Sequence, residues 1–166
     1  ADSAPDISPD GQSIIFGKWE DNIQALNRIS IDGKDQTRLT NYPAWAPAQS
    51  PNGQWIGAYF YDQQARNDGY GLIPVTGGPP SKSFDFPGFQ YEWVRWTRDS
   101  RNVSFIGAPP DPSNIWLQPI DGTAAKQLTD FKTDYIFRHA WSYDGKTLGV
   151  ARGRPAFDVV LLKNDK

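Results

Sequence analysis

The sequence predicts an all-β fold in which one four-stranded unit is repeated four times, and two markers in each unit support this. The first marker is a five-residue turn motif that recurs at a spacing of roughly 45 residues. Its copies are Ser8–Gln12, Ser50–Gln54, Thr97–Arg101 and Ser142–Lys146. The second marker is a later turn, found in the first three units as Asp32-Gly33, Gly77-Gly78 and Asp121-Gly122. Two turns at a near-constant separation imply two antiparallel hairpins, and hence four strands per unit.

Short strands that repeat with this period are typical of β-propeller blades. We therefore expect a single domain over 1–166, a β-propeller whose blades cover approximately 1–41, 42–86, 87–131 and 132–166. The aromatic content of 14%, with 15 Gly and 14 Pro, fits a packed and turn-rich β protein and argues against disorder.

The strands follow from the two turns. Strand one ends just before the first marker. The last residue of this strand, here called the strand-one slot, is Ile7, Gln49, Trp96 and Trp141 in the four units. The flat tryptophan side chains are expected to pack between adjacent blades, because facing sheets lie about 10 Å apart. Strand two follows the marker and strand three precedes the second turn, and both are rich in β-branched and aromatic residues. Strand two is expected at 13–16, 55–60, 103–106 and 147–150, and strand three at 25–31, 70–75, 115–120 and 159–162.

The fourth unit predicts an incomplete blade. Its second turn would fall just past Lys166, so we expect the outer strand to be missing there. The strand-three edge would then expose unpaired backbone groups beside apolar side chains, namely Val159, Val160, Leu161 and Leu162. We expect two half-rings to pair through this edge into an eight-bladed dimer, with a closed four-bladed monomer as the alternative.

Composition excludes several function classes. A formal charge of −2 predicts no nucleic-acid partner, and the absence of an apolar run of about 20 residues predicts no direct membrane contact. With no Cys and one His, a zinc site lacks ligands, and no motif for a cofactor or a catalytic constellation occurs. We therefore expect no metal, no cofactor and no enzymatic activity. The absence of Met suggests a processed, excised or engineered piece of a longer protein.

The repeat resembles a known family. Trp141–Lys146, and Asn114–Trp116 followed by Asp121-Gly122 and Gln127–Thr129, look like TolB-type, WD-repeat-like propeller repeats of bacteria. The longer pattern from Gly78–Pro80 through Trp93–Trp96 to Leu128–Lys132 is similar to the C-terminal propeller of large bacterial signalling proteins, including membrane-anchored serine/threonine kinases and winged-helix regulators. This resemblance implies a sensory or scaffold module beside an effector domain, and an extracytoplasmic or periplasmic location.

The leading interpretation is a noncatalytic module that binds a ligand, a protein or a peptide, and that also pairs with itself. One alternative is the gating propeller of a prolyl-oligopeptidase-like hydrolase, whose repeats look alike. Another is an engineered or excised propeller fragment without a ligand.

The candidate binding surface is the rim formed by the loops between strands two and three and between successive blades, which share one face. Aromatic and arginine residues there are typical of binding surfaces. The candidates are Trp19, Glu20, Tyr42, Trp45, Arg66, Phe89, Tyr91, Tyr135, Arg152 and Arg154. The single histidine, His139, is expected to be buried and hydrogen-bonded on the same sheet face as Trp141.

Overall fold

The computed structural model describes residues 5–62, 67–86, 94–107 and 113–154, and its regular secondary structure there is entirely β. The first sheet contains β1 (Asp6–Ile7), β2 (Ser13–Glu20), β3 (Ile23–Ser30) and β4 (Thr37–Arg38). The second contains β5 (Ala44–Gln49), β6 (Trp55–Asp62), β7 (Asn67–Pro74) and β8 (Lys82–Phe84). The third contains β9 (Arg95–Trp96), β10 (Asn102–Gly107), β11 (Asn114–Pro119) and β12 (Lys126–Gln127). The fourth contains β13 (Tyr135–Trp141) and β14 (Leu148–Gly153).

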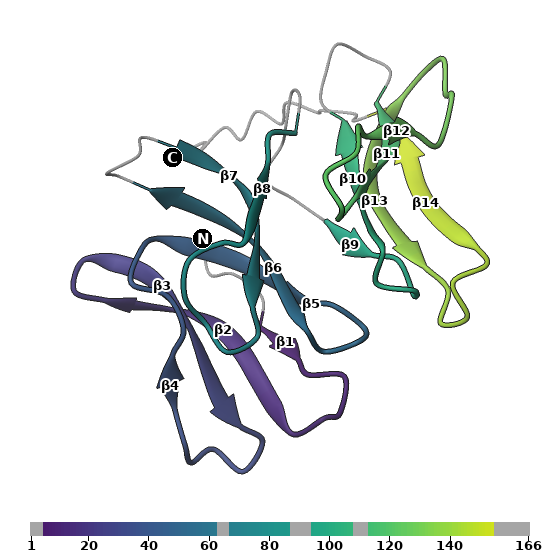
Figure 1. The fold of residues 1–166 in the computed structure, drawn as a ribbon. Helices are drawn as coiled ribbons and strands as arrows, with labels where there is room; N and C mark the ends of the chain where they lie inside the picture. Colours follow the sequence, from purple (N-terminus) through teal and green to yellow (C-terminus); the bar gives the residue numbers. More distant parts are fainter. Residues whose placement is uncertain (1–4, 63–66, 87–93, 108–112, 155–166) are drawn as a thin grey trace, which may run out of the picture.

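The expected all-β propeller architecture is confirmed. Neighbouring strands in every sheet are also neighbours in the chain and pair antiparallel, as in propeller blades (Figure 1). The fourth sheet shows strands one and two of its blade, and the predicted strand at 159–162 lies outside the described residues. Within the described part of the chain, no helix is long and apolar enough to cross a membrane.

Strand two extends further than expected in the first, second and fourth sheets, and in the fourth it includes Arg152, which was expected in a loop. Trp19 and Glu20 belong to β2 rather than to the following loop, and they pair with Gln24 and Ile23 of β3. The hairpin closes with only Asp21 and Asn22, whose φ angles of 52° and 64° are those of a tight primed turn. Such a short turn lets the ladder run to the rim of the sheet.

The recurring five-residue motif forms the same turn between the first and second strands of each sheet. In the first copy, the Ser8 hydroxyl donates to Asp10 Oδ1 at 2.5 Å, and the backbone N–H of Gln12 donates to the same oxygen at 3.0 Å. Gly11 has a φ of 70°, a left-handed backbone conformation that residues with a side chain rarely adopt. The hydroxyl bond lowers the pKa of the Asp10 carboxyl. The repeated aspartates are therefore turn-forming residues, which accounts for their periodicity without a catalytic role.

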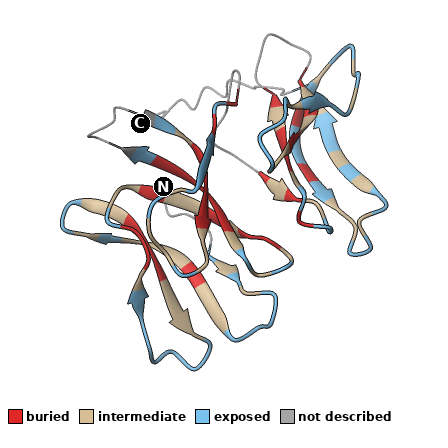
Figure 2. Ribbon diagram, in the orientation of Figure 1, coloured by how far each residue is buried: buried red, intermediate tan, exposed pale blue. Residues whose placement is uncertain are grey.

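The hydrophobic core lies between adjacent sheets (Figure 2). One layer, between the first and second sheets, is formed by Ile15, Leu26, Leu39, Ala44, Ile56, Ala58, Phe60 and Ile73. The layer between the second and third sheets is more aromatic and contains Tyr59, Tyr70, Leu72, Phe84, Phe86, Val94, Trp96, Val103 and Phe105. Burial of each large side chain contributes about 1.5–3 kcal/mol, so these layers hold the blades together.

Polar contacts near the innermost strands also join neighbouring sheets. The backbone N–H of Gln49 donates to the Asp6 carboxylate at 2.6 Å, and the Trp96 indole N–H donates to the Ala48 carbonyl at 2.9 Å. The backbone N–H of Asn52 donates to the Ser100 hydroxyl oxygen at 3.0 Å. Ser100 has a φ of 58° and takes the place that glycine holds in the other copies of this turn.

The first sheet has one apolar face that no other described sheet covers. Ile14 and Ile29 are a register pair on this face and are half-buried, whereas their repeat equivalents in the second sheet, Ile56 and Ile73, are fully buried. Ile7, which occupies the slot of Trp96, is 58% exposed. The face therefore has the composition of a blade interface without a neighbouring blade in the described residues.

Candidate functional site

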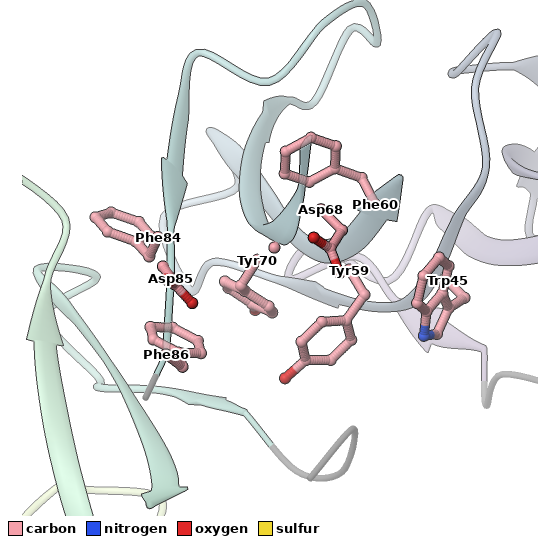
Figure 3. A pocket seen from close by; sticks show the side chains of 9 residues that line it. Trp45, Tyr59, Phe60, Asp68, Tyr70, Phe84, Asp85 and Phe86 are labelled. Atoms are coloured by element: carbon pink, nitrogen blue, oxygen red, sulfur yellow. The ribbon is translucent and has the colours of Figure 1, made fainter. Parts of the chain in front are cut away.

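A small pocket opens at the rim of the second sheet, on the face predicted to bind. It has a volume of about 130 Å³ (Figure 3). Its lining consists of Trp45, Tyr59, Phe60, Asp68, Gly69, Tyr70, Phe84, Asp85 and Phe86. These residues come from the start of β5, the end of β6, the start of β7 and the end of β8 with the residues that follow it. Antiparallel pairing brings those four strand ends to one side of the blade.

Five aromatic rings form a continuous series, the aromatic wall, that runs from the pocket into the interface with the third sheet. The Trp45 and Tyr59 ring centroids are 6.1 Å apart, and those of Tyr59 and Tyr70 are 5.1 Å apart in an edge-to-face arrangement. Tyr70 stacks on Phe86 at 5.4 Å, and Phe86 stacks on Phe105 of the third sheet at 4.1 Å. Aromatic pairs at these distances add to the stability gained from burial, so the wall is a firmly packed part of the blade interface.

The side chains of Asp68 and Asp85 supply the charge of the pocket, and both residues are exposed. Among the residues described, no ion pair to either carboxylate is found. The nine lining residues contain no Lys, Arg or His. The pocket is therefore an aromatic cavity whose lining carries two acidic side chains and no basic one.

The predicted rim residues Tyr42 and Trp45 lie at or beside this pocket. Trp45 lines it, and the Tyr42 ring packs edge-on against Phe60 at 6.2 Å. The Tyr42 hydroxyl donates to the Gly78 carbonyl at 2.9 Å. Tyr42 is therefore tied into the connection between two blades, whereas Trp45 is half-buried at the pocket.

The other described candidates lie elsewhere on the sheets. Trp19, which is 67% exposed, and Glu20 lie at the β2–β3 hairpin, where Glu20 forms an ion pair with Lys18. Tyr135 begins β13 opposite Gly153 of β14. Arg66, Phe89, Tyr91 and the predicted assembly edge Val159, Val160, Leu161 and Leu162 lie outside the described residues.

The two candidate arginines of the fourth sheet bind one carboxylate. Arg154 donates to Asp134 at 2.9 Å, and Arg152 lies 3.4 Å from the same carboxylate while its guanidinium sits 4.0 Å from the centroid of the Phe131 ring. The bonds from Arg154 and from Thr133 hold the pKa of Asp134 below its usual value. These arginines therefore serve the local structure of the rim in this state.

Most of the aromatic pocket lining was not singled out from sequence as a site. Tyr59, Phe60 and Tyr70 fall in predicted strands, and Phe84 falls near the end of the second predicted blade. The available signal was the alternation of Phe84, Asp85 and Phe86, which places both phenylalanines on one side of an extended chain with the carboxylate on the other.

His139 is buried, as expected, at 4% exposure. Its Nε2 lies 2.9 Å from the Ser104 hydroxyl, to which the Trp141 indole N–H also donates at 3.0 Å. Burial lowers the pKa of His139 to about 4, and the positive charge of Arg95 acts in the same direction. Among the described residues, no group of three or more acidic or histidine side chains is placed to hold a metal ion.

Comparisons with known proteins support the fold. No family model matches the chain. An uncharacterized protein of Agrobacterium fabrum is 27% identical over 112 residues, which cover 61% of this chain and 38% of that protein. The structure of TolB from Acinetobacter baumannii is 20% identical with a TM-score of 0.74, and the match covers 95% of this chain and 39% of TolB.

A peptidase propeller is also similar. The β-propeller domain of the Trilobed protease from Pyrococcus furiosus is 12% identical with a TM-score of 0.55, and the match covers 90% of this chain and 47% of that one. The chain thus spans less than half the length of each of these three proteins. At identities this low, structural similarity establishes the fold alone. The fold of this chain is that of a TolB-like β-propeller.

Proposed function

We propose that this protein is a noncatalytic binding module that engages a partner polypeptide through the rim of its second blade. The observation that carries the proposal is the aromatic pocket at the ends of β5 to β8, in the face that the repeat pattern assigns to binding. Concave aromatic sites with a few polar groups are typical of recognition surfaces.

The size of the pocket supports a polypeptide partner. Sites that enclose a whole drug-sized ligand usually measure about 300–1,000 Å³. A volume of about 130 Å³ therefore accommodates one side chain or head group, and the rest of the ligand must lie outside on the rim. The exposed Trp19 offers further contact area on the rim of the neighbouring first blade.

The resemblance of the repeats extends the proposal to a biological setting. We place the module in the sensory or scaffold part of a larger bacterial signalling protein, in an extracytoplasmic compartment. The similarity to TolB supports a noncatalytic propeller. The sensory role rests on the resemblance of the repeats, seen in the sequence, to signalling propellers.

Selection of peptides on the intact chain tests this function. A phage-displayed random peptide library is panned against the protein, and each selected peptide is titrated against wild type, Trp45→Ala and Tyr143→Ala. Tyr143 is the matched control, because it is an exposed aromatic residue in the first turn of the fourth unit, away from the pocket. We expect affinity to fall by about tenfold or more for Trp45→Ala and to persist for Tyr143→Ala. Peptides that bind all three proteins equally, or no selected peptide, would contradict the proposed function.

A second candidate function is the gating propeller of a prolyl-oligopeptidase-like hydrolase, which the similarity to the Trilobed protease propeller favours. The complete reading frame separates the two. A kinase or winged-helix domain upstream supports the sensory module, whereas a hydrolase domain downstream supports the gating role.

A further inference from the structure

We infer that the aromatic pocket selects a cationic head group of the ammonium type, carried by a side chain of the partner polypeptide. This inference rests on the proposed function and adds the chemical class that the pocket recognises. Three properties of the lining carry it: the aromatic wall, the two carboxylates and the small volume.

The aromatic wall is suited to a cation. A positive charge within about 6 Å of a ring centroid is attracted to the face of that ring. The centroids of Trp45, Tyr59, Tyr70 and Phe86 follow one another at 6.1, 5.1 and 5.4 Å. Trp45 is the half-buried ring of this series, whereas Tyr59, Tyr70 and Phe86 are buried behind it, so Trp45 offers the ring surface that a head group would contact.

The carboxylates set the sign of the charge. Asp68 is the second residue of β7 and Asp85 directly follows β8, so the two acidic groups come from different parts of the blade (Figure 3). They contribute two formal negative charges to a lining that contains no basic residue. Such a site attracts cations and repels carboxylate or phosphate groups.

The volume limits the size of the group. A cavity of about 150 Å³ accepts a molecule of the size of benzene in another protein. The pocket, at about 130 Å³, is suited to a compact head group such as a trimethylammonium or a lysine ammonium. An apolar side chain would also fit, but it would supply no positive charge to the two carboxylates, and charge is therefore the feature to test.

The test compares choline with its uncharged carbon isostere, in which a tert-butyl group replaces the trimethylammonium group. Both are titrated into the full chain at low salt while the Trp45 indole N–H resonance is followed by NMR. The chain has 7 Trp, so the resonance is assigned with a Trp45→Phe variant. We expect choline to shift this resonance saturably with a millimolar dissociation constant, and the isostere to bind about tenfold more weakly.

Charge-neutralising variants check the role of the acidic groups. Asp68→Asn and Asp85→Asn should each weaken choline binding by about two- to fivefold, as expected for exposed ion pairs, and should leave binding of the isostere unchanged. Asp35→Asn is the control, because Asp35 is an exposed carboxylate in the β3–β4 connection, at the opposite end of a blade. It should bind choline like wild type.

Each outcome decides the inference. Equal binding of choline and its isostere, or no shift with either, overturns cation selectivity. If selected peptides still depend on Trp45 in that case, the proposed function stands and only the ligand class is wrong. If choline binds selectively but no peptide depends on Trp45, the cation site stands and the polypeptide partner is wrong.

Discussion

The ring of Tyr70 lies directly across Gly57 on the neighbouring strand. A Cβ atom on Gly57 would be 2.0 Å from Tyr70 Oη and 2.6 Å from Tyr70 Cζ, which is too close for any pair of unbonded atoms. The absence of a side chain at Gly57 therefore leaves the space that the Tyr70 ring, part of the aromatic wall of the pocket, occupies.

Gly57→Ala should destabilise the protein, because either the Tyr70 ring or the β6 backbone must move. The expected loss is about 1–3 kcal/mol in the free energy of unfolding, measured by urea denaturation. Gly149→Ala is the matched control, since a Cβ there would meet only the Ala140 carbonyl oxygen, at an ordinary 3.7 Å. If the two variants were equally stable, the close approach of Tyr70 to Gly57 would be wrong.

Tyr70→Phe should leave stability unchanged or raise it by up to about 1 kcal/mol. Tyr70 is 1% exposed, and among the described residues its hydroxyl has no hydrogen-bond partner. Burial raises the pKa of Tyr70 far above its usual value, so the hydroxyl stays neutral and contributes little to folding. Urea denaturation measures the change, and a loss of more than about 1 kcal/mol would show that the hydroxyl makes a bond that the structure does not contain.

His139 should make the stability depend on pH. Its pKa is about 4 in the folded protein and about 6.5 in an unfolded chain, so between these values the unfolded state binds more protons. Stability is complete above pH 6.5 and falls as the pH is lowered, by about 3 kcal/mol in total at pH 4. Denaturation midpoints between pH 7.5 and pH 4 measure this loss.

His139→Gln is the control for the histidine, because glutamine can still bond to Ser104 but does not titrate. Burial raises the pKa of the Asp6 carboxyl, which gives a change of opposite sign at the acidic end in both proteins. The difference between wild type and His139→Gln therefore isolates the histidine. If the stability of the two proteins changed equally with pH, His139 would not be the group responsible for the pH dependence.

The two tryptophans of the strand-one slot should differ in importance. Trp96 is 9% exposed and bonds to Ala48 of the preceding blade, so Trp96→Ala should cost about 3–5 kcal/mol. Trp141 is half-buried against Ser104, and Trp141→Ala should cost roughly half as much. Urea denaturation of both variants gives the comparison, and a larger loss for Trp141 would reverse the proposed order of burial.

The uncovered face of the first sheet bears on assembly. We propose that a second copy covers it, so that two half-rings form an eight-bladed ring, and light scattering should then give a mass of twice 18.6 kDa. Ile14→Lys should return the mass to 18.6 kDa without unfolding the chain, because Ile14 lies on this face. A wild-type mass of 18.6 kDa would instead support the four-bladed monomer.

Much of the fold could be predicted from sequence because its signals are local. Asp10 and Gly11 form the same turn as their repeat equivalents, since a hydroxyl, an Asp or Asn side-chain oxygen and a positive φ within five residues define it. The end of β2 was placed too early, because Trp19 and Glu20 were expected in a loop and the primed turn needs only the two residues after them.

The pocket was only partly predictable because it depends on contacts between distant segments. Trp45 was selected as an aromatic residue on the correct face, but the wall forms where Tyr59 and Tyr70 meet Phe86 and where Phe86 stacks on Phe105. The pairing of blades sets these contacts, and no short window of sequence contains them.

Ser100 links what would otherwise be two separate turns. Glycine in its place would adopt the left-handed backbone with less strain, yet it would offer no hydroxyl to the amide of Asn52, 48 positions earlier in the chain. The turn of the third repeat thus contains a residue in a strained conformation, and in return this residue forms a hydrogen bond to the second blade. This hydrogen bond joins the first turns of the second and third blades, at the opposite end of β6 from the pocket.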